Sequence, residues 1–243
     1  MTEAAPLGWS EMFEDRILSS DSLHVFFSSA LLLAAQSATI AEVGCGRGWQ
    51  VDPDQAERAW QDLRAPDRTV IGIDIDRAAA DNPVIDEFRL IADDGTWPLE
   101  TASIDLAVCD YVLEHVEDPV AFTAELVRVL RPGGAFVART VSRSSPLSLF
   151  ARIVPNRSHA RVLNVLQPGR TERDVFPTQY KMNSRKSLHA LFDRDFEWAA
   201  ASRTSLDQYL LPWPRLGRTA SAVERRLPRV LQSALVICAR KRV

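Results

Sequence analysis

The sequence predicts an α/β protein in which helices cover both faces of a mainly parallel sheet. Short, nearly continuous apolar runs alternate along the chain with helical patterns, and such runs are typical of strands buried on both faces. Glycines and aspartates stand directly after several of these runs. In sheets of this kind, ligands bind beyond the carboxyl ends of the strands, so these residues indicate where a site should lie.

The chain begins with a helical segment, residues 1–37. Apolar residues from Leu23 to Ala34 recur at three- and four-residue steps, and Asp21 or Ser22 can begin the helix. Strands are then expected at 39–43, 69–74, 88–93, 104–110 and 135–140.

Two helices are expected between these strands. The first begins at Asp52, followed by Pro53, and carries Leu63 on its inner face. The second covers residues 119–130 and ends at a Pro-Gly-Gly sequence. Residues 38–141 therefore form one α/β half, which we expect to bind a cofactor.

The regular pattern breaks at 142–180, a stretch rich in Arg, Ser and Pro, which we interpret as an irregular lid or acceptor insertion. Regularity returns over 181–243, which we expect to complete the sheet. A helix begins at Asn183 or Ser184, and strands follow near 198–203 and at 233–239. The helix between these strands carries the apolar residues Leu216, Ala220, Val223 and Leu227. The length suits a single domain over 1–243.

Composition limits the possible classes. Of the residues, 46% are apolar and 25% are charged, as in an ordinary globular protein. The three cysteines are widely spaced and include no CxxC pair, so we expect no disulfide, no metal site and a cytoplasmic location. No apolar run is long enough for a membrane span, and the acidic start is unlike a secretion signal.

Charge divides the chain into two unequal parts. Residues 1–138 carry a formal charge of −16 and residues 139–243 carry +13. The basic part either faces the acidic part or receives an anionic group of a partner. The arginines at 152, 157, 161, 170 and 173 could hold a phosphate or carboxylate of an acceptor, or contact nucleic acid or anionic lipid. The oligomeric state is left open.

The first motif follows the first strand and contains Gly44, Gly46 and Gly48. Glycines permit a tight turn and let a ligand lie against bare backbone. A dinucleotide fingerprint would require a further glycine where Trp49 stands, which argues against a nicotinamide oxidoreductase. Glu42, two residues before the first glycine, suits a ligand with an ammonium or sulfonium charge.

Aspartates follow the next two strands. Asp74 can accept both hydrogen bonds of a ribose, with Asp76 as a nearby rival. Asp93 could accept a hydrogen bond from an adenine amino group, and the Asp94 N–H could serve a ring nitrogen. Both could equally be residues of solvated turns.

Four segments in this order resemble the class I S-adenosylmethionine-dependent methyltransferases, and most closely the small-molecule group called methyltransferase type 11: EVGCGRG, VIGIDID, IADDGTWPLETASIDLAVCDYVLEHVEDP and VRVLRPGGAFV. The resemblance covers about residues 38–141. It implies a Rossmann-like, doubly wound sheet of seven strands in the order 3-2-1-4-5-7-6, with strand 7 antiparallel.

The resemblance also implies a cofactor site for S-adenosyl-L-methionine, which leaves as S-adenosyl-L-homocysteine. The loop beside the methionine part would contain Glu42, Gly44, Cys45, Gly46 and Gly48. Asp74 with Ile75 would hold the ribose, Asp93 with Asp94 the adenine, and Asp110 with Tyr111 the methionine part and the acceptor. One departure is Trp49, Gln50 and Val51, which lengthen the loop before the next helix.

Methyl transfer depends mainly on alignment, so a fixed catalytic motif is not required. A general base could be His115, His159 or Tyr180. Each could instead serve packing or anchoring. Residues 155–161 and 174–180, which contain the last two, look like a patch found in methyltransferases of polysaccharide and natural-product pathways.

The leading hypothesis is methyl transfer to a small-molecule or glycan-linked acceptor, at oxygen, because no NPPY-like motif for nitrogen methylation follows Asp110. A carbon acceptor remains open. The alternatives are a non-catalytic methyltransferase-like scaffold and a nucleic-acid methyltransferase. The acidic overall charge and the lack of an added binding domain argue against nucleic acid.

Overall fold

A computed structural model describes residues 21–34, 37–48, 62–146, 148–149, 178–210 and 213–243 of the chain. Its centre is one seven-stranded sheet in the order β3-β2-β1-β4-β5-β7-β6. Strand β7 runs antiparallel to both β5 and β6, and the other neighbouring strands pair in parallel. Both the predicted order and the antiparallel strand are confirmed.

The strands have these bounds: β1 Thr39–Val43, β2 Thr69–Asp74, β3 Glu87–Leu90, β4 Ile104–Asp110, β5 Leu130–Val141, β6 Phe196–Arg203 and β7 Ala234–Lys241. The helices are α2 Ser22–Ala34, α3 Pro119–Val129, α6 Arg185–Phe192, α7 Leu206–Tyr209 and α8 Pro214–Glu224, with short 3-10 turns η2 Arg77–Asp81 and η4 Arg229–Leu231. The helix predicted to begin at Asp52 lies largely outside the described residues.

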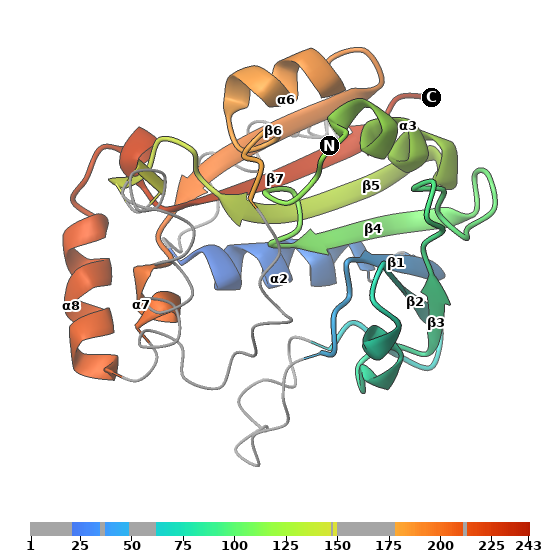
Figure 1. Ribbon diagram of the computed structural model, residues 1–243, viewed down its shortest axis with the longest axis horizontal. Helices are drawn as coiled ribbons and strands as arrows, with labels where there is room; N and C mark the ends of the chain where they lie inside the picture. Colours follow the sequence, from blue (N-terminus) through green and yellow to red (C-terminus); the bar gives the residue numbers. More distant parts are fainter. Residues whose placement is uncertain (1–20, 35–36, 49–61, 147, 150–177, 211–212) are drawn as a thin grey trace, which may run out of the picture.

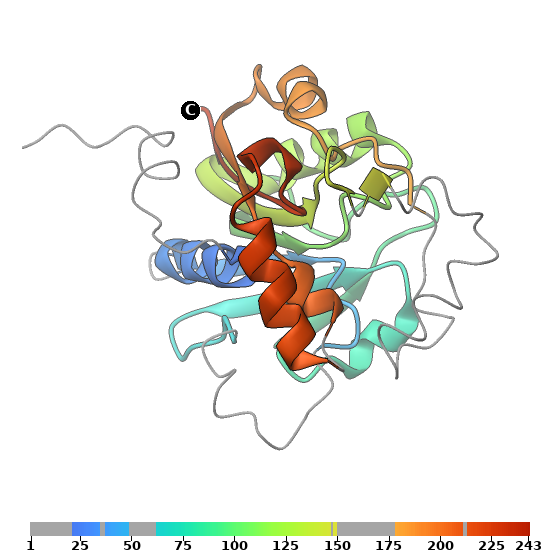
Figure 2. The ribbon, with the colours of Figure 1, turned by 90° about the vertical axis from the view of Figure 1, so that its left-hand side faces the viewer.

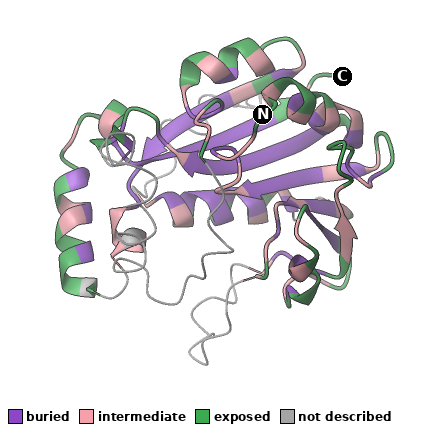
Figure 3. Cartoon of the chain, viewed as in Figure 1, coloured by how far each residue is buried: buried purple, intermediate pink, exposed green. Residues whose placement is uncertain are grey.

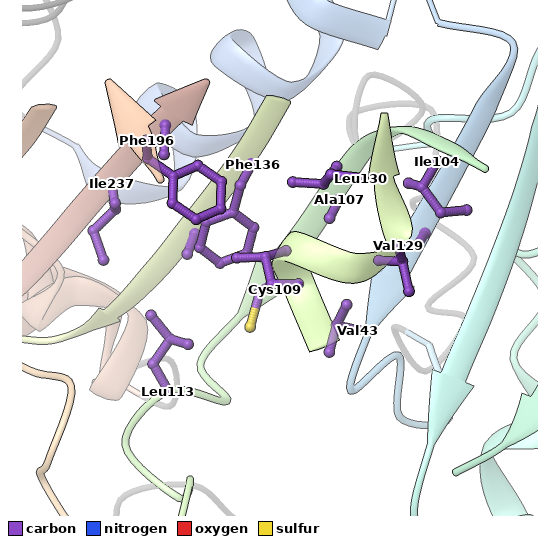
Figure 4. Close-up of a cluster of buried hydrophobic side chains, with 14 of the residues drawn as sticks. Val43, Ile104, Ala107, Cys109, Leu113, Val129, Leu130, Phe136, Phe196 and Ile237 are labelled. Atoms are coloured by element: carbon purple, nitrogen blue, oxygen red, sulfur yellow. The ribbon is translucent and has the colours of Figure 1, made fainter. Parts of the chain in front are cut away.

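Each face of the sheet has its own apolar core. On one face, Val25, Phe26 and Ala30 of α2 pack with alternate strand residues such as Ile40 and Val108. On the other face, the buried residues of α3 and α6 join the opposite set of strand residues. Figure 4 shows part of this second cluster, around Phe136 and Cys109. Helix α2 therefore lies on one side of the sheet and α3 and α6 on the other (Figure 1), as expected of strands buried on both faces.

Side chains fix the helix starts. Of the two predicted caps for α2, Asp21 accepts a hydrogen bond from Leu23 N–H at 2.8 Å. The Asp118 carboxylate caps α3. Ser184, rather than Asn183, caps α6 through a reciprocal capping box with Ser187.

Two predicted strands differ most from the observed bounds. β3 ends at Leu90 instead of 93 because it is a partly exposed edge strand whose pairing stops there. β5 starts at Leu130, so the Pro-Gly-Gly stretch belongs to the strand. Its register jumps from Ile104↔Leu130 to Leu106↔Ala135, which makes residues 131–134 a bulge.

The C-terminal helices are less buried than the sheet (Figure 3). Helix α8 packs against α7 through Gly217, Ser221 and Glu224, which are buried. The apolar residues Leu216 and Val223 are instead 55% and 54% exposed. Most of the predicted irregular segment, residues 150–177, lies outside the described residues.

Candidate cofactor and acceptor site

The predicted site residues gather at the carboxyl ends of the parallel strands. Glu42 lies in β1, Asp74 ends β2 and Asp110 ends β4. Because β1 lies between β2 and β4 in the sheet, these three carboxylates come from neighbouring strands. The topology therefore builds one acidic edge from residues far apart in sequence.

The turn after β1 is shaped by backbone. The N–H groups of Gly44 and Cys45 donate to Ile73 O at 2.8 and 3.3 Å, which folds the turn over β2. Gly44, Gly46 and Gly48 all have positive φ, a conformation that favours glycine. A Cβ at Gly44 would clash with Val112, whereas one at Gly46 would meet none of the described residues within 4 Å. Within the described part of the chain, Gly46 thus presents bare backbone that no side chain covers, as a ligand cradle requires.

Asp74 holds this turn to β2. Its carboxylate accepts from Gly46 N–H at 2.9 Å and from Asp76 N–H at 2.8 Å, and the residue is 8% exposed. A carboxylate can accept more than two hydrogen bonds, so capacity remains for a ribose hydroxyl. The rival Asp76 has another task, because its side chain caps η2 by accepting from Ala78 N–H. Its ion pair with Arg47, at 3.9 Å, is half exposed.

Asn82 is a supporting residue that sequence reasoning missed. Its amide donates to Cys45 O at 2.8 Å and accepts from Val84 N–H at 2.9 Å. A Cβ at Gly48 would lie 2.5 Å from the Asn82 side-chain oxygen, so Gly48 is needed for close packing here. Cys45 points its thiol at Gly72, inside the protein, and burial raises its pKa to about 12. Cys45 can therefore serve a ligand only through its backbone.

The predicted adenine side is open. Ile75, next to Asp74, is an apolar side chain that is 64% exposed. Asp93 and Asp94 are exposed, and the Asp94 carboxylate accepts from Thr96 N–H at 2.9 Å. Gly95, with positive φ, closes this turn onto Ala92 O. The exposed apolar side chain of Ile75 therefore follows β2, and the exposed carboxylate of Asp93 follows the neighbouring strand β3.

Glu42 has a strongly perturbed pKa. Burial, and then the negative charges of Asp110, Asp62 and Asp74, raise it from 4.5 to about 8. A positive charge placed among these carboxylates would favour their charged forms. The edge is therefore suited electrostatically to a cationic ligand.

Asp110 forms a bidentate ion pair with a buried arginine that the sequence analysis did not single out. Arg139 of β5 donates from Nε and Nη2 to the two Asp110 oxygens, each at 2.7 Å, and is 1% exposed. The Arg139 guanidinium lies 4.5 Å from the centre of the Tyr111 ring and donates to Gln208 of α7 at 2.8 Å. Asp110 is therefore held in one orientation by two charge-assisted hydrogen bonds.

A second buried network lies beside this pair. Glu114 is 3% exposed and accepts from Thr140 Oγ1 at 2.8 Å, while Asn183 Nδ2 donates to Thr140 Oγ1 at 2.6 Å. Burial raises the pKa of Glu114 from 4.5 to about 7. The Glu114 carbonyl accepts from Gln179 and Tyr180 N–H at 2.7 and 3.2 Å.

Two of the three predicted base candidates are brought together here. Tyr180, with φ of 53°, is bonded through its backbone to Glu114, the residue before His115. Both side chains are partly buried. His159 lies outside the described residues. Their roles as bases stay predictions.

No group of three or more His, Cys, Asp or Glu side chains in the described part of the chain could hold a metal ion. Within the same residues, no helix combines the length and apolarity that crossing a membrane demands.

The fold and the site geometry together define a class. A glycine turn with an open face, a buried carboxylate beside it and acids at the strand ends fit a nucleoside that carries positive charge. The seven-stranded fold is that of the class I S-adenosylmethionine-dependent methyltransferases. Residues 41–138 match the type 11 family described as "Methyltransferase domain".

Individual relatives agree with the family. A Mycolicibacterium smegmatis protein named "Probable S-adenosylmethionine-dependent methyltransferase" is 35% identical over 53% of this chain and 47% of its own. The malonyl-[acyl-carrier protein] O-methyltransferase of Hahella chejuensis is 31% identical over 42% of this chain and 36% of its own. This chain thus spans less than half of these relatives.

A solved S-adenosylmethionine-dependent methyltransferase from Mesorhizobium loti has the same fold, with a TM-score of 0.50. It is 21% identical, and the match covers 88% of this chain and 95% of that one.

Proposed function

We propose that the protein transfers a methyl group from S-adenosylmethionine to an oxygen of a small-molecule or glycan-linked acceptor. The observation that carries this proposal is the face of Gly46 that no described side chain covers, which Asp74 holds at the sheet edge that also carries Glu42 and Asp110. A nucleoside with a sulfonium and an ammonium group complements such an edge in both shape and charge.

The residues present fit the cofactor. Asp74 would hold the ribose, Ile75 would cover the adenine, and Asp93 with the Asp94 N–H would bond its edge. Glu42 and Asp110 would face the positively charged methionine part. When bound, S-adenosylmethionine supplies a methyl group already activated by the sulfonium.

Residues after β4 and before α6 would receive the acceptor. His115 and Tyr180 stand on two segments that Glu114 ties together, so either could take a proton from an acceptor hydroxyl. An oxygen acceptor is supported by the relative that is named a malonyl-[acyl-carrier protein] O-methyltransferase. The exposed basic residues Arg143 and Lys181 lie near the same segments and favour an acceptor with an anionic group.

Titration calorimetry with S-adenosylhomocysteine tests the cofactor part. We expect micromolar binding by the wild type, as is common for such ligands, and its loss in Asp74→Ala. Circular dichroism and thermal unfolding must show that the variant is folded. A folded wild type that does not bind would leave the scaffold alternative.

Methyl transfer is then tested with radiolabelled S-adenosylmethionine and a panel of phenols, sugars and carboxylic acids. Mild alkali releases label from an ester and leaves it on an ether or an amine, so it identifies one class of oxygen product. The pH dependence of turnover in His115→Gln and Tyr180→Phe would show which of the two, if either, acts as the base. Label transferred only to RNA would overturn the proposal.

A further inference from the structure

Helix α8 and the residues around it expose a row of large apolar side chains. Trp213, Leu216, Val223 and Val230 are 42%, 55%, 54% and 60% exposed. Leu216 and Val223 are seven residues apart, which places them on the same side of the helix two turns apart. We refer to these four residues as the α8 stripe. Figure 2 shows α8 as the element nearest the viewer on this side of the molecule.

The α8 stripe is exposed because a different face of the helix is anchored to the protein. Gly217 packs closely on Asp207 of α7, since a Cβ at Gly217 would lie 3.2 Å from the Asp207 Cα. Glu224 is 1% exposed and accepts from the N–H groups of Ser205, Leu206 and Ser233. Small and polar contacts therefore fix the helix, and its large apolar residues Leu216 and Val223 remain exposed.

The charge around the α8 stripe has a single sign. Five arginines within 213–232 are exposed: Arg215, Arg218, Arg225, Arg226 and Arg229. The only acid in this stretch is Glu224, which is buried. Exposed apolar side chains on one side of a helix, with exposed arginines on its other sides and a tryptophan at its start, are typical of helices that lie in the interface of an anionic bilayer.

We propose that the α8 stripe and its arginines dock the protein on the surface of an anionic lipid bilayer. The bilayer interface offers acyl chains to the apolar side chains and phosphates to the arginines at the same time. Nucleic acid would satisfy the arginines and leave the apolar row in water. The proposal goes beyond the proposed methyl transfer and does not depend on it.

The docking surface is connected to the site. α8 packs on α7, and Gln208 of α7 accepts a hydrogen bond from Arg139, which grips Asp110. In Figure 1, β4 and β5 point toward the side on which α7 and α8 lie. A bilayer bound to α8 would therefore lie on the same side as the carboxyl ends of these strands.

Vesicle flotation with the full chain tests the proposal. One set of vesicles contains equal parts phosphatidylglycerol and phosphatidylcholine, and the other contains phosphatidylcholine alone. We expect binding to the anionic vesicles only, and a loss of about tenfold or more in Leu216→Ser/Val223→Ser, because two apolar side chains no longer insert. The matched control is Leu32→Ser/Val120→Ser, whose residues are 62% and 70% exposed on α2 and α3 and should not affect binding.

Three outcomes would overturn the proposal. The wild type could fail to bind anionic vesicles, the α8 variant could bind as well as the control, or light scattering could show a dimer that the α8 variant disrupts. The last result would make the α8 stripe a contact between copies. Calorimetry with S-adenosylhomocysteine separates this proposal from the other, because the α8 variant should bind the nucleoside as the wild type does.

Discussion

The turn after β1 and the turn after β4 leave neighbouring strands at the same edge of the sheet, but different forces hold them. Backbone shapes the first, through three glycines with positive φ and N–H groups bonded to Ile73 and Asp74. Buried charge shapes the second, in which Asp110 is clamped by Arg139. A ligand at this edge would therefore meet bare backbone on one side and fixed side chains on the other.

This difference predicts that different kinds of substitution destabilise the two turns. Adding a side chain should disrupt the β1 turn. Gly44 has no room for a Cβ, and the face of Gly46 must stay uncovered for a ligand to lie against it. The β4 turn should fail when a charge is removed, because the remaining partner stays in a poorly solvated place. Substitutions can test each expectation, and the largest effect should come from the charged side.

Removing the arginine should have the largest effect. Arg139→Met leaves Asp110 without its bidentate partner, and we expect a loss of about 3–5 kcal/mol in the free energy of unfolding. The measurement is urea denaturation at neutral pH. Arg131→Met is the matched control, because Arg131 pairs with Asp105 at 2.6 Å but is 47% exposed. It should lose only about 0–1 kcal/mol.

The double variant Arg139→Met/Asp110→Asn sharpens this test. If the cost comes from an unpaired carboxylate, the double variant should be more stable than Arg139→Met alone. If both Arg139 variants are as stable as the Arg131 control, buried charge does not hold the β4 turn.

Adding a methyl group to the β1 turn should have the next largest effect. At Gly44, alanine would have an unfavourable φ and a Cβ only 2.3 Å from Val112 Cγ2, so we expect a loss of about 2–4 kcal/mol. At Gly46 only the φ is unfavourable, so the loss should be about 1–2 kcal/mol.

Calorimetry then separates an effect on folding from an effect on ligand binding. Gly46→Ala should bind S-adenosylhomocysteine about tenfold or more weakly, because the methyl group occupies the open face. Unchanged affinity in that variant would show that the ligand does not lie against Gly46.

The pH dependence of stability should identify Glu42. Its pKa is raised in the folded protein, from 4.5 to about 8, so its neutral form is favoured there. Its contribution to stability is therefore full below pH 4.5 and is lost as the pH rises to 8. Relative to Glu42→Gln, the free energy of unfolding of the wild type should fall by up to about 1.4 kcal/mol per pH unit between these limits, measured by urea denaturation at a series of pH values. Parallel curves for the two proteins would contradict this.

The two turns also differ in how far they could be predicted. β1, β2 and β4 were predicted with the observed bounds because a glycine or an aspartate ends each apolar run. The glycine turn was visible for the same reason, since its function depends on residues next to each other. Arg139 was not found because its partner is 29 residues away and becomes a neighbour only through the register Asp110↔Arg139. Helix α8 was predicted, but periodicity cannot show which of its faces meets the protein.

The smallest effect should come from the rival aspartate, and it tests the acid that would hold the ribose. Asp76→Ala removes a cap from η2 and a half-exposed pair with Arg47, so we expect a loss of about 1 kcal/mol. S-adenosylhomocysteine should still bind within about threefold of the wild type, since a surface pair contributes so little. Asp74→Ala should abolish binding in the same assay. Loss of binding in Asp76→Ala, with binding kept in Asp74→Ala, would assign the ribose hydroxyls to Asp76. Asp74 would then serve only to hold the glycine turn.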